Sequence, residues 1–322
     1  MRIALPFCRR LFTGLLLTSI FHGARADDCP PTPTAPSAEQ IAAATAAATT
    51  DHGLLWRIRR DGHESYLYGT LHIGRLAWSV PGPEVRRAWQ ATDELALELD
   101  ISDPKTLRAL MQTPPMAKPL GPALQARLDA QIRVACLPEA VLAPLHPLMQ
   151  ISTLTMLAAR RDDLDSGYAQ ESMLLGLAQS SGRKVVALEN AQEQIAALIP
   201  KDPQELRRNI VDGLEQLERN EVRAPMLKLA QAWADSDLQA LQSYEQWCDC
   251  IHGEADRRYL RGMTEARNPR MAERIAALHA SGKRVFAAVG ALHMTGPTGL
   301  PALLRKMGFK VERLVPSAPS AE

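Results

Sequence analysis

A short stretch near the start of the chain alternates between apolar and polar side chains, with the period of two that is typical of a β-strand, and a second strand-like run follows it. The two cover residues 54–59 and 65–71, and Asp61 and Gly62 stand between them. An Asp-Gly pair between two such runs favours a tight turn. The pattern therefore predicts a β-hairpin.

Beyond the hairpin, the pattern alternates between helical stretches and short apolar runs. Asn268 followed by Pro269 predicts a helix N-cap with proline in the first turn. The predicted helical regions are 83–91, 104–178, 203–261, 271–280 and 300–307, and the predicted strands are 94–99, 184–188, 284–289 and 309–315. This order predicts an α/β (α+β) fold, in which a mixed central β-sheet is flanked by helices and a large helical insertion lies between strands.

A Gly-x-x-His motif closes two of the predicted strands, near opposite ends of the chain. Residues 69–72 read GTLH and residues 290–293 read GALH. Glycine lets the backbone turn sharply at a strand end, so His72 and His293 can each point over the tip of a strand. Brought together by folding, two neutral imidazoles could bind one metal ion or one substrate.

Acidic side chains close two other predicted strands. Glu98 and Glu189 each end an apolar run. Burying an unpaired carboxylate costs several kcal/mol, so each acid belongs either to an ion pair or to a functional site. Ligands of open α/β sheets bind outside the carboxyl ends of the strands, so we expect His72, Glu98, Glu189 and His293 to share one edge.

The first residues have the features of a cleavable secretory signal. Arg2, Arg9 and Arg10 precede the apolar run 11–21, and an Ala-x-Ala sequence ends at Ala26. That run is shorter than the roughly 20 residues that a spanning helix needs, so no stable membrane insertion is expected after cleavage. We therefore expect an exported, periplasmic protein. The expected division is a signal peptide (1–26), a disordered leader (27–50), one folded domain (51–316) and a disordered tail (317–322).

Composition narrows the classes of partner. The formal net charge is +1 and aromatic residues make up 5% of the chain. Such a chain lacks the basic stripe of a nucleic-acid binder and the stacking platforms that bases require. The expected partner is a peptide or a small molecule, and the oligomeric state stays open.

Cleavage of the signal would leave the cysteines Cys29, Cys136, Cys248 and Cys250. An even number in an oxidising compartment is compatible with two disulfides. The closely spaced Cys248 and Cys250 are expected to bond to distant cysteines, with Cys136 as the partner of one of them. The alternative is that this pair binds a metal or acts as a redox pair.

Several of these segments resemble one known family. The chain is similar to the TraB/GumN family, which includes the Tiki-type metal-dependent proteases. The segments that carry the resemblance are 68–74, 98–100, 185–194, 267–268 and 288–303. The resemblance implies a mixed sheet with helical layers, an active site formed by the two Gly-x-x-His motifs, and metal-dependent peptidase activity. In place of the family's Gly-x-Asp element, Gly167 is followed by Tyr168, and Glu171 stands nearby.

With this resemblance, each candidate residue receives an expected role. His72, His293 and Glu98 would bind a divalent metal ion. Glu189 or Glu171 would orient or deprotonate a metal-bound water, whose pKa the ion lowers.

Two further residues complete the candidate site. Arg267 or Asn268 would stabilise the developing oxyanion, and Arg270 is a second-tier alternative.

Two other functions could use the site that these residues form. A non-catalytic periplasmic protein could sequester a peptide or small ligand there, and an esterase-type hydrolase would differ only in substrate. A G-x-S-x-G elbow and an H-E-x-x-H helix are both absent from the sequence. Ligands of a metal must therefore come from separate strand ends.

Overall fold

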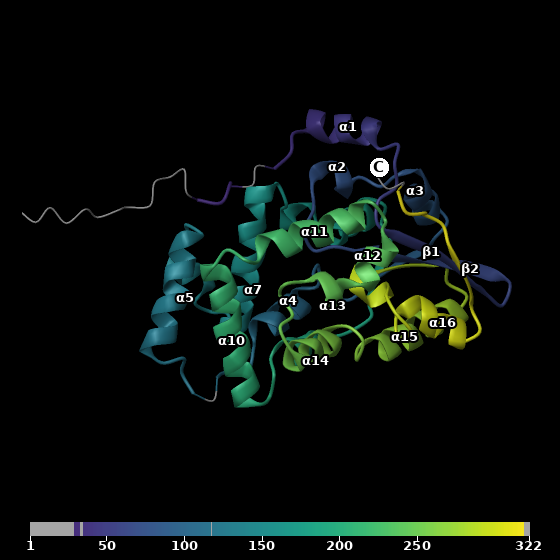
Figure 1. The fold of residues 1–322 in the computed structure, drawn as a ribbon. Coiled ribbons are helices and arrows are strands. Elements are labelled where there is room, and N and C mark those ends of the chain that lie inside the picture. The colour runs from purple at the N-terminus through teal and green to yellow at the C-terminus, as the bar shows by residue number, and fades with distance from the viewer. Residues whose placement is uncertain (1–28, 33–34, 117, 319–322) are drawn as a thin grey trace, which may run out of the picture.

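A six-stranded β-sheet lies at the centre of the structure, a computed structural model that describes residues 29–32, 35–116 and 118–318 (Figure 1). The strand order is β4-β3-β5-β2-β1-β6. The strands are β1 (Leu54–Arg60), β2 (His63–Thr70), β3 (Glu94–Leu97), β4 (Lys184–Ala187), β5 (Val285–Gly290) and β6 (Lys310–Arg313). Strands β4, β3, β5 and β2 are mutually parallel, whereas β1 is antiparallel to both of its neighbours.

The predicted hairpin is confirmed. Strands β1 and β2 pair in antiparallel register, with Arg60 opposite His63. The turn between them places both Asp61 (φ 55°) and Gly62 (φ 84°) in the left-handed region. Two consecutive positive φ angles define the turn whose twist matches that of the strands, which is why Asp-Gly occupies it.

Helices fill the connections between the strands. Those before β4 are α1 (Ala38–Ala47), α2 (Leu76–Ser79), α3 (Pro83–Gln90), α4 (Pro104–Met111), α5 (Pro122–Val134), α6 (Glu139–Leu142), α7 (Pro147–Ala158), η2 (Ala159–Asp162), η3 (Ser166–Tyr168) and α8 (Gln170–Ser180). Those after β4 are α9 (Ala191–Leu198), α10 (Pro203–Glu218), α11 (Arg223–Ala234), α12 (Leu238–Gln242), α13 (Tyr244–Trp247), α14 (Glu254–Met263), α15 (Asn268–Ala280), η4 (Ala291–Met294) and α16 (Leu300–Lys306).

Two apolar cores hold these elements together. The larger one surrounds the sheet, where β5 is buried along its length from Val285 to Val289. The smaller one joins α5, α7 and α10, with Leu128, Ile151 and Leu214 among its members. Figure 1 shows these three helices packed beside one another, away from the sheet. The predicted α/β class and the helical insertion between strands are confirmed.

The predicted helical region 104–178 is interrupted in the structure. Helix α4 ends at Met111, and the next helix begins at Pro122. Pro114, Pro115 and Pro119 lie between them. Proline lacks the N–H group that a helix interior requires, so the interruption has a local cause that the apolar pattern concealed.

The predicted signal peptide (1–26) lies outside the described residues. Within the expected leader, the structure differs from the prediction in residues 38–47, which form α1. Ser37 and Gln40 cap this helix reciprocally, although none of its residues is buried. At the other terminus, the Ala318 amide donates to the Asp235 carbonyl. Within the described residues, no helix combines the length and apolar character needed to cross a membrane.

The disulfide pairing predicted for the closely spaced cysteines is wrong. Cys248 bonds to Cys250, with Cα atoms 5.1 Å apart, and Cys136 bonds to Cys29, with Cα atoms 5.6 Å apart. Both separations lie in the usual range for a disulfide. Cys136 is not available to either member of the C-x-C pair, because the segment before α1 reaches the C-terminal end of α5.

Candidate active site

Four neighbouring strands end at one edge of the sheet, and each delivers a candidate side chain there. Glu189 follows β4, Glu98 follows β3, His293 follows β5 within η4, and His72 follows β2. The parallel register aligns these ends, because Thr70 of β2 pairs with Gly290 of β5. The charges of Glu98 and His72 both act on the pKa of His293, and Nε2 of His293 lies 4.0 Å from Oε1 of Glu98.

The glycines of the two Gly-x-x-His motifs provide space rather than a special backbone conformation. Neither Gly69 nor Gly290 has a positive φ. A Cβ atom on Gly290 would lie 3.3 Å from Oε1 of Glu98 and 3.5 Å from Cδ2 of His293. A Cβ atom on Gly69 would lie 3.1 Å from Cγ of Met294. The tight packing at both strand ends therefore favours glycine, and the expected sharp turn is not its cause.

Arg267 joins the two acidic strand ends. Its Nη2 lies 2.6 Å from Oε2 of Glu98 and also donates to Oε2 of Glu189, while its Nε lies 3.0 Å from Oε1 of Glu189. Its Nη1 lies 2.7 Å from the Met263 carbonyl and 3.4 Å from Nε2 of His293. Burial alone would lower the pKa of Arg267, but the hydrogen bond to Glu189 and the charge of Glu98 raise it. The guanidinium is therefore a permanent cation whose donors all have protein partners.

Glu98 is the most extensively hydrogen-bonded acid of the site. Besides Arg267, its Oε2 accepts from Nε2 of Gln194 at 3.1 Å, and its Oε1 accepts from the Gly290 amide at 2.8 Å. Burial favours the protonated acid, but the charge that His293 gains in acid, the charges of His72 and Arg267 and the Gly290 amide lower the pKa of Glu98 to about 2. Glu98 is a carboxylate at neutral pH.

His293 is held by Asn268. The distance from Nδ1 of His293 to Oδ1 of Asn268 is 2.6 Å, and Nδ2 of Asn268 donates to the Thr298 carbonyl at 2.9 Å. Burial lowers the pKa of His293 to about 4, so the ring is neutral at pH 7. Because Oδ1 only accepts, the proton of the neutral ring is on Nδ1. The unprotonated Nε2 lies 4.0 Å from Oε1 of Glu98.

Asn268 differs from its sequence-based interpretation as a helix cap. It is the first residue of α15 rather than the residue before it, and its side chain is fully buried against His293 and the Thr298 carbonyl. Helix α15 therefore begins as predicted, but the asparagine turns towards the histidine instead of the helix amides.

His72 forms a second histidine–carboxylate pair, with Glu171. Its Nδ1 lies 3.2 Å from Oε1 of Glu171, which also accepts from the Thr70 hydroxyl. The charge of Glu171 raises the pKa of His72 to about 9. Water screens part of this attraction, since 67% of the His72 side chain is exposed. The second carboxylate oxygen of Glu171 is buried and has no hydrogen-bond partner.

Arg270 is not placed with this group. Its side chain is 61% exposed and pairs with Glu193 on α9. The sequence reasoning also missed Gln194 and Thr70, which hydrogen-bond Glu98 and Glu171. Both lie inside the segments that carry the family resemblance, and their position there was the only available signal.

The donors present are of the type that divalent metals use, imidazole nitrogen and carboxylate oxygen. They form two pairs, His72 with Glu171 and His293 with Glu98. In the described part of the chain, no three His, Cys, Asp or Glu side chains converge closely enough to hold an ion.

Comparison with known proteins gives three results. A family model described as the TraB/PrgY/gumN family matches residues 54–313. The chain is 25% identical over 321 residues to a protein of Danio rerio named Metalloprotease TIKI1, a match that covers 81% of this chain and 63% of that protein. It is 23% identical over 325 residues to a Nematostella vectensis protein named Metalloprotease TIKI homolog, covering 82% and 68%. No solved structure matches the chain significantly.

Proposed function

The chain belongs to the TraB/PrgY/gumN family, and on that premise we propose that it is an exported hydrolase of peptide bonds that depends on a divalent metal ion. The observation that carries the proposal is the pair of histidine–carboxylate contacts, His72 with Glu171 and His293 with Glu98, at one edge of the sheet. The names of the two curated relatives support it. The basic, apolar and Ala-x-Ala features of residues 1–26 support export.

Two observations favour a cation between the two pairs. The buried Oε2 of Glu171 lacks a partner, which is costly for a carboxylate unless a cation binds it. In addition, the three carboxylates of Glu98, Glu171 and Glu189 share the site with two cations, Arg267 and protonated His72. A divalent cation that displaced the proton of His72 would leave the site without net charge.

His72, Glu171, His293 and Glu98 would supply the ligands, and the two pairs would have to move closer together, because no three such side chains of the described residues converge on one point. Once bound, a divalent ion polarises a carbonyl group and lowers the pKa of water.

The protein's own groups would prepare this chemistry. Nε2 of His293 carries no proton, because Asn268 keeps the proton on Nδ1, and it would act as a ligand or base once it separates from Nη1 of Arg267, which lies 3.4 Å away. Arg267 holds Glu98 and Glu189 in fixed positions, and its donors are already occupied. We therefore propose that Arg267 and Asn268 position other residues rather than contact an oxyanion. His72 is the exposed member of the site and is placed to meet substrate first.

Metal titration combined with a cleavage assay tests this proposal. The purified full chain is stripped with chelator, and Zn²⁺, Mn²⁺ and Co²⁺ are added back separately while a mixture of unstructured peptides is analysed by mass spectrometry. The proposal requires binding of one ion per chain and cleavage that chelator abolishes. A chain that binds peptide equally well in excess chelator and cleaves none would instead be a periplasmic binding protein. Cleavage of ester but not peptide bonds would identify an esterase.

A further inference from the structure

The Cys248–Cys250 disulfide is a poor candidate for a stabilising cross-link. It joins residues two positions apart, within the connection between α13 and α14, whereas Cys29 and Cys136 are 107 positions apart. A disulfide stabilises mainly by restricting the unfolded chain, and this effect is smallest for the shortest loops. The bond also ties no separate element to another, so its role must lie elsewhere.

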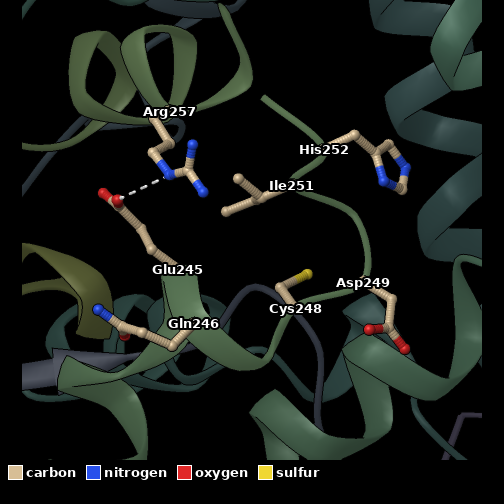
Figure 2. A pocket seen from close by; sticks show the side chains of 7 residues that line it. All are labelled: Glu245, Gln246, Cys248, Asp249, Ile251, His252 and Arg257. Carbon is tan, nitrogen blue, oxygen red and sulfur yellow. Dashed lines mark ion pairs between the residues drawn. The ribbon is translucent and has the colours of Figure 1, made fainter. Parts of the chain in front are cut away.

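The bond lies beside a cavity. Cys248 lines a cavity of about 570 Å³, together with Glu245, Asp249, His252 and Arg257. Figure 2 shows Cys248 between the Glu245–Arg257 ion pair on one side and Asp249 and His252 on the other. Cys248 is only 4% exposed, so a small thiol would have to approach its sulfur from this cavity, and disulfides that can be reached are the ones that exchange.

Tyr244 faces both sulfur atoms. Its hydroxyl oxygen lies 3.4 Å from Sγ of Cys250 and 3.4 Å from Sγ of Cys248. Disulfide sulfurs carry no proton, so the hydroxyl is the only donor among these three atoms. Burial raises the pKa of Tyr244, which keeps this donor protonated. A hydroxyl in this position can stabilise a thiolate when the bond opens.

We propose that Cys248–Cys250 is a thiol–disulfide exchange centre that oxidises cysteine thiols of small molecules or peptides. A substrate thiolate attacks Sγ of Cys248 from the cavity, and the bond to Cys250 breaks. Cys250 leaves as a thiolate, hydrogen-bonded by Tyr244. A second substrate thiolate attacks the substrate sulfur of the mixed disulfide and expels Cys248. Two substrate thiols become one disulfide, and the two electrons and two protons remain on the Cys248–Cys250 dithiol. A second disulfide-bearing molecule restores the bond by the reverse exchange.

A redox titration of the full chain tests this inference independently of hydrolysis. The protein is equilibrated in buffers of graded glutathione to glutathione-disulfide ratio, quenched in acid, alkylated and analysed by mass spectrometry. Cys248–Cys250 is expected to open at ratios that leave Cys29–Cys136 closed. If both bonds open together, or the C-x-C bond opens last, the inference is overturned.

A kinetic experiment provides a second test of the exchange centre. A peptide with two cysteines is mixed with the oxidised protein, and formation of its disulfide is followed. Tyr244→Phe should slow this step about tenfold, the effect of losing one hydrogen bond to a charged group. Ser243→Ala removes the neighbouring hydroxyl, which bonds the carbonyls of Gln239 and Ala240 instead, and should leave the rate unchanged. Equal rates for Tyr244→Phe and the unmodified chain, with both folded by circular dichroism, would remove Tyr244 from the centre.

Discussion

Nδ1 of His293 lies 2.6 Å from Oδ1 of Asn268, and this contact determines which ring nitrogen of His293 faces the acids. The same asparagine is fixed from its other side by the Thr298 carbonyl, so it cannot flip to offer its amide group. A buried asparagine at the start of α15 thereby sets the protonation of a histidine that is 25 residues away in sequence.

Asn268→Asp should raise the pKa of His293 from its depressed value of about 4. A carboxylate in contact with Nδ1 stabilises the charged imidazole. The measurement is a titration of the histidine ring resonances by NMR, with His279, which is buried elsewhere, as the internal reference. An unchanged His293 titration would mean that Asn268 does not govern this ring.

Arg267→Met should lower the free energy of unfolding by about 3–5 kcal/mol, because Glu98 and Glu189 would stay buried without their cation. Arg270→Met is the matched control. Its side chain is 61% exposed, and removing an exposed ion pair costs about 1 kcal/mol or less. Urea denaturation at pH 7 measures both. Similar losses in the two variants would contradict the central position of Arg267.

His72→Ala should abolish metal-dependent cleavage while changing the free energy of unfolding by less than about 1 kcal/mol. An exposed loop side chain contributes far less to stability than core truncations, which cost about 2–5 kcal/mol. His252→Ala is the control and should cleave normally, because His252 is an exposed histidine in the cavity beside Cys248. If His72→Ala unfolds, the histidine is structural.

Stability should decrease as the pH falls below about 6.5, partly because of His279. This ring is buried, stacks on His63 at 3.7 Å between centroids, and bonds the Ser65 hydroxyl and the Arg60 carbonyl. Burial lowers its pKa, so the folded state binds fewer protons than the unfolded state below the ordinary value. Stability is therefore complete above about 6.5 and is lost towards the depressed folded pKa, by at most about 1.4 kcal/mol per pH unit.

His279→Gln removes this titration while keeping a side chain that can hydrogen-bond. Urea midpoints at pH 7.5 and 5.5 should therefore differ less for the variant than for the unmodified chain. An equal pH dependence in both proteins would assign the effect to other groups.

The strand ends could be predicted from the sequence, because short apolar runs ending in His or Glu are local patterns. The parallel register that ends β2 and β5 at the same edge, ahead of His72 and His293, follows from the general rule that parallel strands end at one edge. The contacts of Arg267 could not be predicted, since they join three segments whose distance is set only by packing. The sequence favours Arg267 over Arg270 only through the family resemblance, and it gives no indication that Arg267 joins two acidic strand ends.

The role of Asn268 was misread for a similar reason. An Asn-Pro pair favours a helix start in any context, and the sequence does not tell which way the asparagine side chain turns. The pairing of the cysteines could not be predicted for the same reason. Cys248 and Cys250 were expected to avoid each other, but which cysteine Cys136 reaches depends on where the segment around Cys29 lies in space.

The pairing of β2 with β5 determines when the candidate site can form during synthesis of the chain. These strands come from residues 63–70 and 285–290, so β2 cannot pair with β5 until residues 285–290 have been synthesised. Contacts between such distant segments form late, because closing a long loop is entropically unfavourable. A partly translated or C-terminally truncated chain therefore carries half a site. An enzyme assembled in this way would be inactive until β5 has paired with β2.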